Sequence, residues 1–300
     1  MTFSRNVILV GDALHHLRQL PSASVDLAIT SPPYFGLRDY GADGQYGLEP
    51  NVNAWVERMC LVFAEVARAL KPTGSLWLNL GDSYSAHERF GAPPKCQVLA
   101  PERLLLALVG DGWILRNKVI WTKPNAIPTS VKDRFKTTHE YFYFLVRGPR
   151  YFFDLDAVRE PHRTHRPTAE RRPPNLSGVI GPLAAKRDGL SRARLNGIPG
   201  HLLGKNPGDT WSIATQSFRG AHFATFPEAL VRRPILASCP RGGLVLDPFF
   251  GTGTIGVVAE QLGRDWIGIE INPAYAAMAE ERLAKARAPD DPRRQLRQAA

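Results

Sequence analysis

The sequence predicts an α/β protein in which a mainly parallel sheet is covered by helices on both faces. Short apolar segments typical of strands alternate with longer segments of helical spacing, which indicates parallel strands joined by crossover helices. The 300 residues, 44% of them hydrophobic and 22% charged, suffice for one large core with an insertion. The alternation is interrupted once, over residues 159–208, which are rich in Pro, Gly, Arg and His.

Before this interruption, five apolar segments predict strands, and three segments with an apolar residue every three or four positions predict helices. The first strand, NVILVGDA, is expected to be short and buried and to end at Gly11-Asp12. The other strands are expected within residues 21–30, 74–82, 115–124 and 139–148. The helices are expected at residues 14–20, 53–70 and 100–113.

After the interruption, regular structure is expected to resume. Residues 226–238 have helical spacing, and residues 243–263 predict a strand, a glycine turn and a helix. The last strand is expected at residues 265–272. The last helix is expected to begin at Pro273, because proline suits the first turn of a helix. The tail at 288–300 is expected to fray.

The cysteines and the apolar segments exclude several classes of protein. Cys60, Cys96 and Cys239 lie far apart and form no CxxC pair, so neither a zinc site nor a disulfide framework is expected. They are interpreted as buried free thiols. The N-terminal apolar run is too short for a signal peptide, and no segment approaches the roughly 20 apolar residues of a membrane span. A soluble cytoplasmic protein without a metal centre or a membrane partner is therefore predicted.

The interruption carries most of the positive charge of the chain. The net charge of +10 and the pI of about 9.8 favour a polyanionic partner. Residues 159–205 contain ten basic and three acidic residues, a net charge of +7. A solvated linker is the alternative, but the clustering fits a nucleic-acid-binding insertion better. The residues expected to contact the nucleic acid are Arg163, Arg166, Arg171, Arg172, Lys186, Arg187, Arg192 and Arg194.

A glycine turn, GTGTIG at residues 251–256, follows a predicted strand and opens a helix. Gly251 and Gly253 would let the backbone approach a ligand, and Glu270, at the end of the next strand, could accept hydrogen bonds from both ribose hydroxyls. The pattern alone fits a dinucleotide, but little of a second nucleotide-binding half follows, and a Gly-Lys-Ser/Thr ending is lacking. S-adenosylmethionine suits the turn better, with Asp247 near its sulfonium, although Asp247 could equally be a turn or cap residue.

The segment LAITSPPYFG, residues 27–36, leaves the second strand through a stiff corner that is poor in donors and rich in acceptors. An exocyclic amino group on a base is a poor nucleophile, because its lone pair is delocalised into the ring. Ser31 Oγ and the carbonyl of Pro32 could accept its two N–H bonds and free that lone pair. Tyr34 offers a face on which a base that has left the duplex could stack. A strand-terminating turn with a core tyrosine is the alternative, which the pairing with DPFFGTGT and Glu270 disfavours.

Together these motifs resemble those of the DNA amino-methyltransferases, which modify N4 of cytosine or N6 of adenine. TSPPY comes first, the basic segment follows and LDPFFGTGT comes last, which is similar to the circularly permuted β class of that family. The resemblance covers most of residues 6–287 and implies a Rossmann-like fold with a seven-stranded, mostly parallel sheet containing one antiparallel strand. It implies a catalytic half at 1–158, a target-recognition insertion at 159–208, a cofactor-binding half at 209–287 and a flexible tail at 288–300.

The resemblance also implies a role for each residue that matches the family motifs. The catalytic corner would be formed by Ser31, Pro32, Pro33 and Tyr34. The residues expected to bind S-adenosylmethionine are Asp12, Ala13, Thr30, Phe226, Pro227, Asp247, Pro248, Phe249, Gly251, Gly253, Thr254, Glu270, Ile271 and Asn272. Phe250 stands where a smaller residue is commoner, which would narrow the cofactor pocket.

The expected reaction is transfer of a methyl group from S-adenosylmethionine to N4 of a flipped-out cytosine in double-stranded DNA. Many relatives have Asp where this chain has Ser31, and the resemblance of TSPPY is closest to enzymes that act on cytosine N4. Both residues accept from an amino group, so adenine N6 stays open. Methylation of RNA or a protein amide, for which NPPY is typical, and an inactive DNA-binding module are further alternatives. Methylation at the ring carbon of cytosine is set aside, because none of the three cysteines follows a proline. A separate cognate restriction endonuclease and a homodimer are compatible with this reaction.

Overall fold

The computed structural model describes residues 4–162, 203–215 and 226–287. The chain divides into two compact units, one made of Met1–Asp154 with Asp209–Ala300 and one made of Leu155–Gly208. The strands are β1 (Val7–Val10), β2 (Val25–Thr30), β3 (Leu70–Leu80), β4 (Ile114–Thr122), β5 (His139–Val146), β6 (Thr210–Ser212), β7 (Leu244–Asp247) and β8 (Asp265–Glu270). The α-helices are α1 (Ala13–Gln19), α2 (Val52–Ala69), α3 (Ala100–Gly110), α5 (Glu228–Ser238), α6 (Thr254–Gln261) and α7 (Pro273–Arg287).

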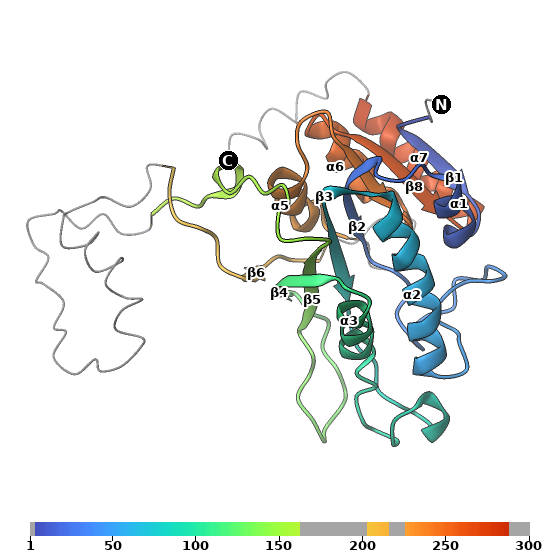
Figure 1. Ribbon diagram of the computed structural model, residues 1–300. Helices are drawn as coiled ribbons and strands as arrows, with labels where there is room; N and C mark the ends of the chain where they lie inside the picture. Colours follow the sequence, from blue (N-terminus) through green and yellow to red (C-terminus); the bar gives the residue numbers. More distant parts are fainter. Residues whose placement is uncertain (1–3, 163–202, 216–225, 288–300) are drawn as a thin grey trace, which may run out of the picture. The chain divides into compact units, whose positions relative to one another are not determined.

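The eight strands of the described residues belong to the first unit and form one sheet in the order β1-β8-β7-β2-β3-β5-β4-β6 (Figure 1). Only β5 runs antiparallel to its neighbours, so the prediction of a mostly parallel sheet with one antiparallel strand is confirmed. The predicted number of seven strands is wrong, because β6 adds an eighth. It has three residues and buries only Trp211, which is too short a pattern to predict a strand.

The first strand is not buried as predicted. β1 lies at the edge of the sheet and pairs only with β8, so three of its residues are partly exposed to solvent and Val10 is exposed. An apolar run therefore marked the strand correctly but not its place in the sheet, since an edge strand lacks the second neighbour that would cover it.

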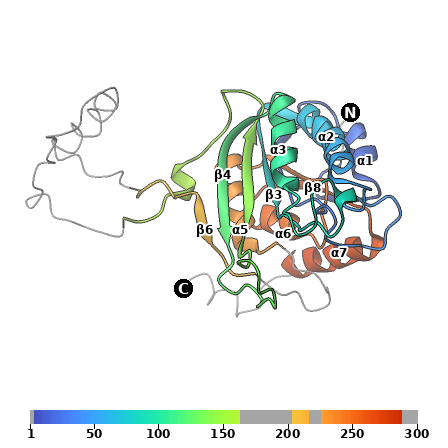
Figure 2. The same cartoon turned by 90° about the horizontal axis from the view of Figure 1, so that it is seen from below.

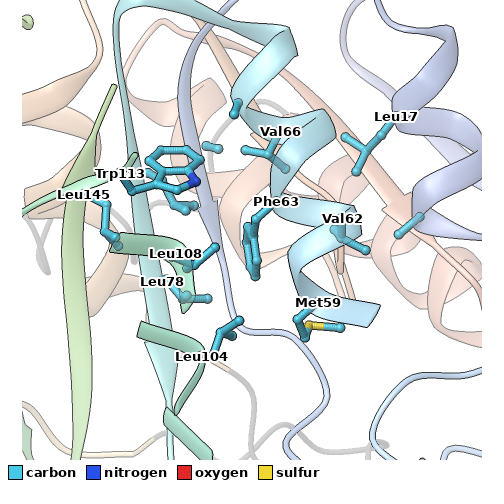
Figure 3. Close-up of a cluster of buried hydrophobic side chains, with 14 of the residues drawn as sticks. Leu17, Met59, Val62, Phe63, Val66, Leu78, Leu104, Leu108, Trp113 and Leu145 are labelled. Atoms are coloured by element: carbon cyan, nitrogen blue, oxygen red, sulfur yellow. The ribbon is translucent and has the colours of Figure 1, made fainter. Parts of the chain in front are cut away.

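Helices cover both faces of the sheet, as predicted. Helices α1, α2 and α3 lie on one face of the sheet, and α5, α6 and α7 lie on the other (Figure 2). The apolar side chains of the first three helices belong to one buried cluster, and those of the other three belong to a second. In the first cluster, Phe63 and Val66 project from α2 toward Leu104 and Leu108 of α3, which lie beside Leu78 of β3 (Figure 3). Truncation of a buried Phe such as Phe63 typically costs about 3–5 kcal/mol, so this layer is a large part of the stability of the unit.

The chain turns in opposite directions at two neighbouring strands, β2 and β7. After β2, the chain crosses through α2 on one face to β3, and after β7 it crosses through α6 on the other face to β8. The ends of β2 and β7 are therefore left uncovered beside each other. In open α/β sheets, such a point at the carboxyl ends of parallel strands is where ligands bind.

The second unit is described at its two ends. Glu160 and Lys205 form an antiparallel bridge through both backbone hydrogen bonds, and Arg159 pairs with Asp156 of a short 3₁₀ helix. Gly204 is required beside this bridge, because a Cβ there would lie 2.1 Å from the carbonyl oxygen of Glu160. The eight basic residues predicted to contact DNA lie outside the described residues.

Within the described residues, no helix combines the length and the apolar composition that crossing a membrane requires. The cysteines differ from the prediction of buried thiols. Cys239 is buried, but Cys60 is partly exposed and Cys96 is exposed, and all three are free. Cys96 lies in a loop, outside the apolar segments that form the helices and strands of the core.

Candidate active site

A pocket of about 250 Å³ lies at the carboxyl edge of the sheet, where β2 and β7 end. It brings together the two motifs that are more than 200 residues apart in the sequence. All four residues of the predicted catalytic corner line it. Nine of the fourteen predicted cofactor residues line it as well, namely Ala13, Phe226, Asp247, Pro248, Phe249, Gly251, Thr254, Glu270 and Ile271.

Three of the other five predicted cofactor residues support the pocket from behind. Thr30, fully buried at the end of β2, donates a hydrogen bond of 2.6 Å to Asp247. The backbone N–H of Asn272 donates to Glu270 over 2.8 Å, and its side chain caps the start of α7. Asp12 caps α1 in the same way and accepts a hydrogen bond from the hydroxyl of Tyr46, which does line the pocket.

The last two, Pro227 and Gly253, lie at helix starts. Pro227 directly precedes α5. Gly253 precedes α6 with a φ of +78°, and a Cβ there would lie 2.9 Å from that of Ala279 in α7. Gly253 thus allows close packing of two helices, whereas Gly251, with a φ of +54°, lines the pocket and has open space where a Cβ would stand.

Asp247 is a buried carboxylate, and its hydrogen-bond donors among the described residues are neutral. It is 2% exposed, and its Oδ1 accepts from the Thr30 hydroxyl and from the backbone N–H of Phe249 at 3.0 Å. Burial, together with the nearby charge of Glu270, raises the pKa of Asp247 to about 7 despite these hydrogen bonds. A buried carboxylate that has no cationic partner within the described part of the chain is suited to receive a positively charged ligand group.

Glu270 holds the glycine turn against the end of β8. Its Oε2 accepts from the backbone N–H of Gly251 at 2.7 Å, and its Oε1 accepts from that of Asn272 at 2.8 Å. Burial raises the pKa of Glu270, and these backbone donors oppose that rise. Each carboxylate oxygen has capacity for a further donor, so the side chain can also accept from two hydroxyls of a ligand.

The catalytic corner is held rigid by its neighbours. The indole of Trp55, buried in α2, donates to the carbonyl of Pro33 over 3.1 Å. Gly47, at a φ of +97°, packs so closely under the corner that a Cβ would lie 2.9 Å from the carbonyl oxygen of Tyr34. Gly81 likewise leaves room for the Tyr34 ring, which a Cβ would approach to 2.9 Å.

Three polar residues that the sequence-based prediction missed also line the pocket beside the corner: Asn79, Lys123 and Glu140. The Tyr34 hydroxyl lies 2.8 Å from Glu140 Oε2 and 3.1 Å from both Asn79 Oδ1 and Ser31 Oγ. Lys123 forms an ion pair with Glu140. Glu140 was missed because it opens the aromatic run HEYFYF, whose pattern indicates a strand core; a charged residue at a strand end was the only signal.

Phe250 does not take the place expected from the resemblance. It borders the pocket, but its ring is 4% exposed and stacks on Trp266, with the ring centroids 5.0 Å apart. The ring fills the space over Gly268 of β8 and Gly256 of α6, where a Cβ would lie 2.3 Å and 2.7 Å from it. The large side chain is therefore accommodated by two glycines in the core and does not project into the cofactor pocket.

A family model of N6/N4 DNA methylases matches residues 25–281 of the chain. The chain belongs to this DNA methylase family. The matched range contains both the corner and the glycine turn, so the prediction of a DNA amino-methyltransferase that uses S-adenosyl-L-methionine is confirmed.

Curated relatives extend the similarity over nearly the whole chain. The type II methyltransferase M.Cfr9I of Citrobacter freundii is 40% identical in an alignment of 294 residues, which covers 91% of this chain and 86% of that protein. The type II methyltransferase M.SmaI of Serratia marcescens is 38% identical and covers 93% of this chain and 91% of its own length.

Solved structures confirm the fold class. The cytosine-N4-specific PvuII DNA methyltransferase matches with a TM-score of 0.68 at 21% identity, over 97% of this chain and 89% of its own. A putative DNA modification methylase from Thermus thermophilus, in complex with S-adenosyl-L-methionine, matches with a TM-score of 0.61 at 26% identity. The match covers 94% of this chain and 96% of that protein. At these identities, the first match supports the architecture of the sheet and helices only.

Proposed function

We propose that this methyltransferase modifies the exocyclic N4 amino group of cytosine in a base turned out of duplex DNA. The observation that carries the proposal is the Ser31 hydroxyl at the wall of the pocket, 3.1 Å from the Tyr34 hydroxyl. A serine at this position, followed by Pro-Pro-Tyr, is the pattern most similar to cytosine-N4 enzymes. The relatives named type II methyltransferases support a role in restriction and modification.

The residues of the pocket fit S-adenosyl-L-methionine by the chemistry of their donors and acceptors. Around the glycine turn, the pocket offers the carboxylates of Asp247 and Glu270 and the aromatic ring of Phe249. Asp247 would face the cationic part of the cofactor and Glu270 its ribose, with Phe249 packed over it. When bound, the cofactor supplies a methyl group on a positively charged sulfur, which needs no metal ion or second cofactor to react.

The corner would prepare the amino group for attack. Ser31 Oγ and the carbonyl of Pro32 would accept its two N–H bonds, which draws the nitrogen toward tetrahedral geometry and frees its lone pair. The neighbouring carbonyl of Pro33 is engaged with Trp55 and so fixes the corner instead. Tyr34 would stack on the flipped base, because its ring lines the pocket while its hydroxyl is anchored at the edge.

Nucleoside mass spectrometry tests the target base directly. Purified protein, S-adenosyl-L-methionine and unmethylated DNA of varied sequence are incubated, and the DNA is digested to nucleosides. We expect N4-methylcytosine. A product of N6-methyladenine would refute the cytosine assignment and keep the family reaction, whereas no methylated nucleoside together with no cofactor binding would favour an inactive DNA-binding module.

Asp247→Asn is expected to weaken the binding of the cofactor and to stabilise the cofactor-free protein at alkaline pH. Asparagine keeps the acceptor for Thr30 and Phe249 but loses the charge, so affinity for S-adenosyl-L-methionine at pH 8 should fall about tenfold or more. Titration calorimetry at pH 8 measures this loss. Asp265→Asn, at the opposite end of β8, is the matched control and should leave the affinity unchanged.

The stability change has a definite sign. The pKa of Asp247 is about 7 in the folded chain and about 3.9 in an unfolded one. Between these values the folded chain holds the extra proton, so the free energy of unfolding falls as pH rises through this window. Urea unfolding of the cofactor-free protein at pH 5.5 and pH 8 should therefore show a smaller drop for Asp247→Asn than for the wild type. An equal drop in both proteins would show that Asp247 is already ionised at pH 5.5.

A further inference from the structure

A chain of hydrogen bonds leads from the catalytic corner to an ion pair at the other wall of the pocket. Ser31 Oγ lies 3.1 Å from the hydroxyl oxygen of Tyr34, and that oxygen lies 2.8 Å from Glu140 Oε2. Glu140 is paired through its other oxygen with Lys123, whose ammonium also lies 4.6 Å from the ring centre of Trp121. All of these residues line the pocket.

The direction of each hydrogen bond follows from counting protons. A carboxylate only accepts, so Tyr34 must donate its single proton to Glu140, which is closer and charged, rather than to Asn79 at 3.1 Å. Tyr34 then has no proton left for Ser31. The contact between the two hydroxyls is therefore a donation from Ser31 to Tyr34, which leaves the lone pairs of Ser31 Oγ for a substrate N–H.

We propose that Glu140 is a positioning residue of the methyl-transfer reaction and the terminal proton acceptor of a relay through Tyr34 and Ser31. The proposal rests on the proposed function of Ser31. As the nitrogen–carbon bond forms, the carbon–sulfur bond breaks and its electron pair stays on sulfur. The nitrogen then carries the positive charge and must lose one proton. That proton passes to Ser31 Oγ, the Ser31 proton to Tyr34 and the Tyr34 proton to Glu140 Oε2, so the nitrogen and the carboxylate both become neutral.

The sheet places Glu140 where this relay needs it. β5 runs antiparallel to β3 and β4, so its first residues lie at the same edge as the end of β2 and the end of β4. Glu140 pairs in register with Trp121, which sets it next to Lys123 directly after β4. Burial, and then the charge of Glu140, raise the pKa of Tyr34, so the hydroxyl keeps its proton until it is passed on.

Lys123 and Glu140 have different parts in the relay. Lys123 forms an ion pair with Glu140, and the carboxylate of Glu140 beside the Tyr34 hydroxyl makes the oxygen of that hydroxyl a better acceptor for Ser31. If the ion pair were purely structural, loss of either partner would lower the methyl-transfer rate equally. In the relay only the carboxylate receives a proton, so the two partners are not equivalent.

Single-turnover methyl transfer by Glu140→Gln and Lys123→Gln separates the two cases. We expect Glu140→Gln to lower the rate about 10- to 100-fold, because glutamine keeps the shape but cannot take up the proton. Lys123→Gln retains the carboxylate and should lower the rate less than threefold. Equal losses in both variants would overturn the relay. Glu102→Gln, which removes an ion pair with Lys118 outside the pocket, is the matched control and should keep the wild-type rate.

A double substitution distinguishes a role of Glu140 in the relay from a purely structural role. If Glu140 acts through the Tyr34 hydroxyl, then Glu140→Gln should cost nothing further in a Tyr34→Phe background, where the relay is already cut. Affinity for S-adenosyl-L-methionine and the unfolding midpoint are measured for every variant, and a rate loss that follows either of them would also overturn the relay. If Glu140→Gln lowers the rate of Tyr34→Phe as much as it lowers the wild-type rate, the relay is overturned as well.

The relay and the proposed function fail in different measurements. Adenine as the methylated base would refute the cytosine assignment, but either amino group loses one proton, so the Glu140 comparison would stand. An unchanged rate in Ser31→Ala would remove the serine on which both depend. A wild-type rate in Glu140→Gln, with N4-methylcytosine as product and Ser31→Ala impaired, would refute the relay alone.

Discussion

Ser31→Ala is expected to lower the single-turnover rate of methyl transfer about 100-fold while the affinity for S-adenosyl-L-methionine changes less than twofold. The substitution removes the side-chain acceptor that would hold one N–H of the amino group, and it also cuts the hydrogen bond to Tyr34. A hundredfold loss corresponds to about 2.7 kcal/mol of transition-state stabilisation, which is in the range for loss of one preorganised hydrogen bond in an active site.

The cofactor affinity should be spared because the side chain of Ser31 is bonded to Tyr34, whereas the residues suited to the cofactor gather around Asp247 and Glu270. Transfer of tritiated methyl groups to DNA under single-turnover conditions measures the rate, and calorimetry measures the affinity. Ser24→Ala is the matched control, because Ser24 bonds a nearby carbonyl at the opposite end of β2. Parallel losses of rate and affinity would make Ser31 a cofactor residue instead.

The parts of the site that could be predicted from the sequence are those whose chemistry is local. The Ser-Pro-Pro-Tyr corner is stiff because of its own prolines, and the glycine turn is recognisable because a strand precedes it and a helix follows. Their meeting at one pocket also follows from sequence order, since both motifs end parallel strands and the carboxyl ends of such strands share one edge.

The parts that could not be predicted depend on partners far away in the sequence. Glu140 reaches Tyr34 only because β5 is the one antiparallel strand, which brings its first residues to the edge where the other strands end. No local pattern distinguishes it from an exposed acid at a strand start. Phe250 was misjudged for a related reason: the space for its ring is created by Gly256 and Gly268, and neither glycine can be paired with it from spacing alone.

The fold shows the same division. The core helices were predicted from a periodic apolar face, as α2 has with Trp55, Met59 and Phe63, and the core strands were predicted from short apolar runs, as in β2, which is buried throughout. The edge position of β1 and the existence of β6 depend on which strands pair, and strand order leaves little trace in a single short segment.

Gly268→Ala is expected to destabilise the protein by about 3 kcal/mol or more, although alanine is the smallest possible addition. Gly268 lies inside β8, and a Cβ there would stand 2.3 Å from Cγ and 2.4 Å from Cδ2 of Phe250. The ring cannot retreat, because it stacks on Trp266 on one side and meets Gly256 of α6 at the other. Overpacking of a well-filled core usually costs about 1–3 kcal/mol, and a contact this short belongs at or beyond the upper end.

The loss should extend to the cofactor, because Phe250 belongs to the turn that follows β7. Its backbone N–H donates to Ile269 at 2.8 Å, and its carbonyl accepts from Gly253 at 3.0 Å, so a displaced ring would shift the glycine turn. Urea unfolding measures the stability and calorimetry the affinity. Gly110→Ala, at the end of α3, is the matched control; a Cβ there has open space, and its stability should stay the same or rise slightly.

A double substitution identifies the clash as the cause. Phe250→Ala alone should cost about 3–5 kcal/mol through the cavity that it leaves. With the ring gone, the added methyl group of Gly268→Ala has room, so the double variant should be at least as stable as Phe250→Ala. Costs that simply add would show that Gly268 is needed for its backbone and not for the ring, and the account of Phe250 as a core residue matched to two glycines would be wrong.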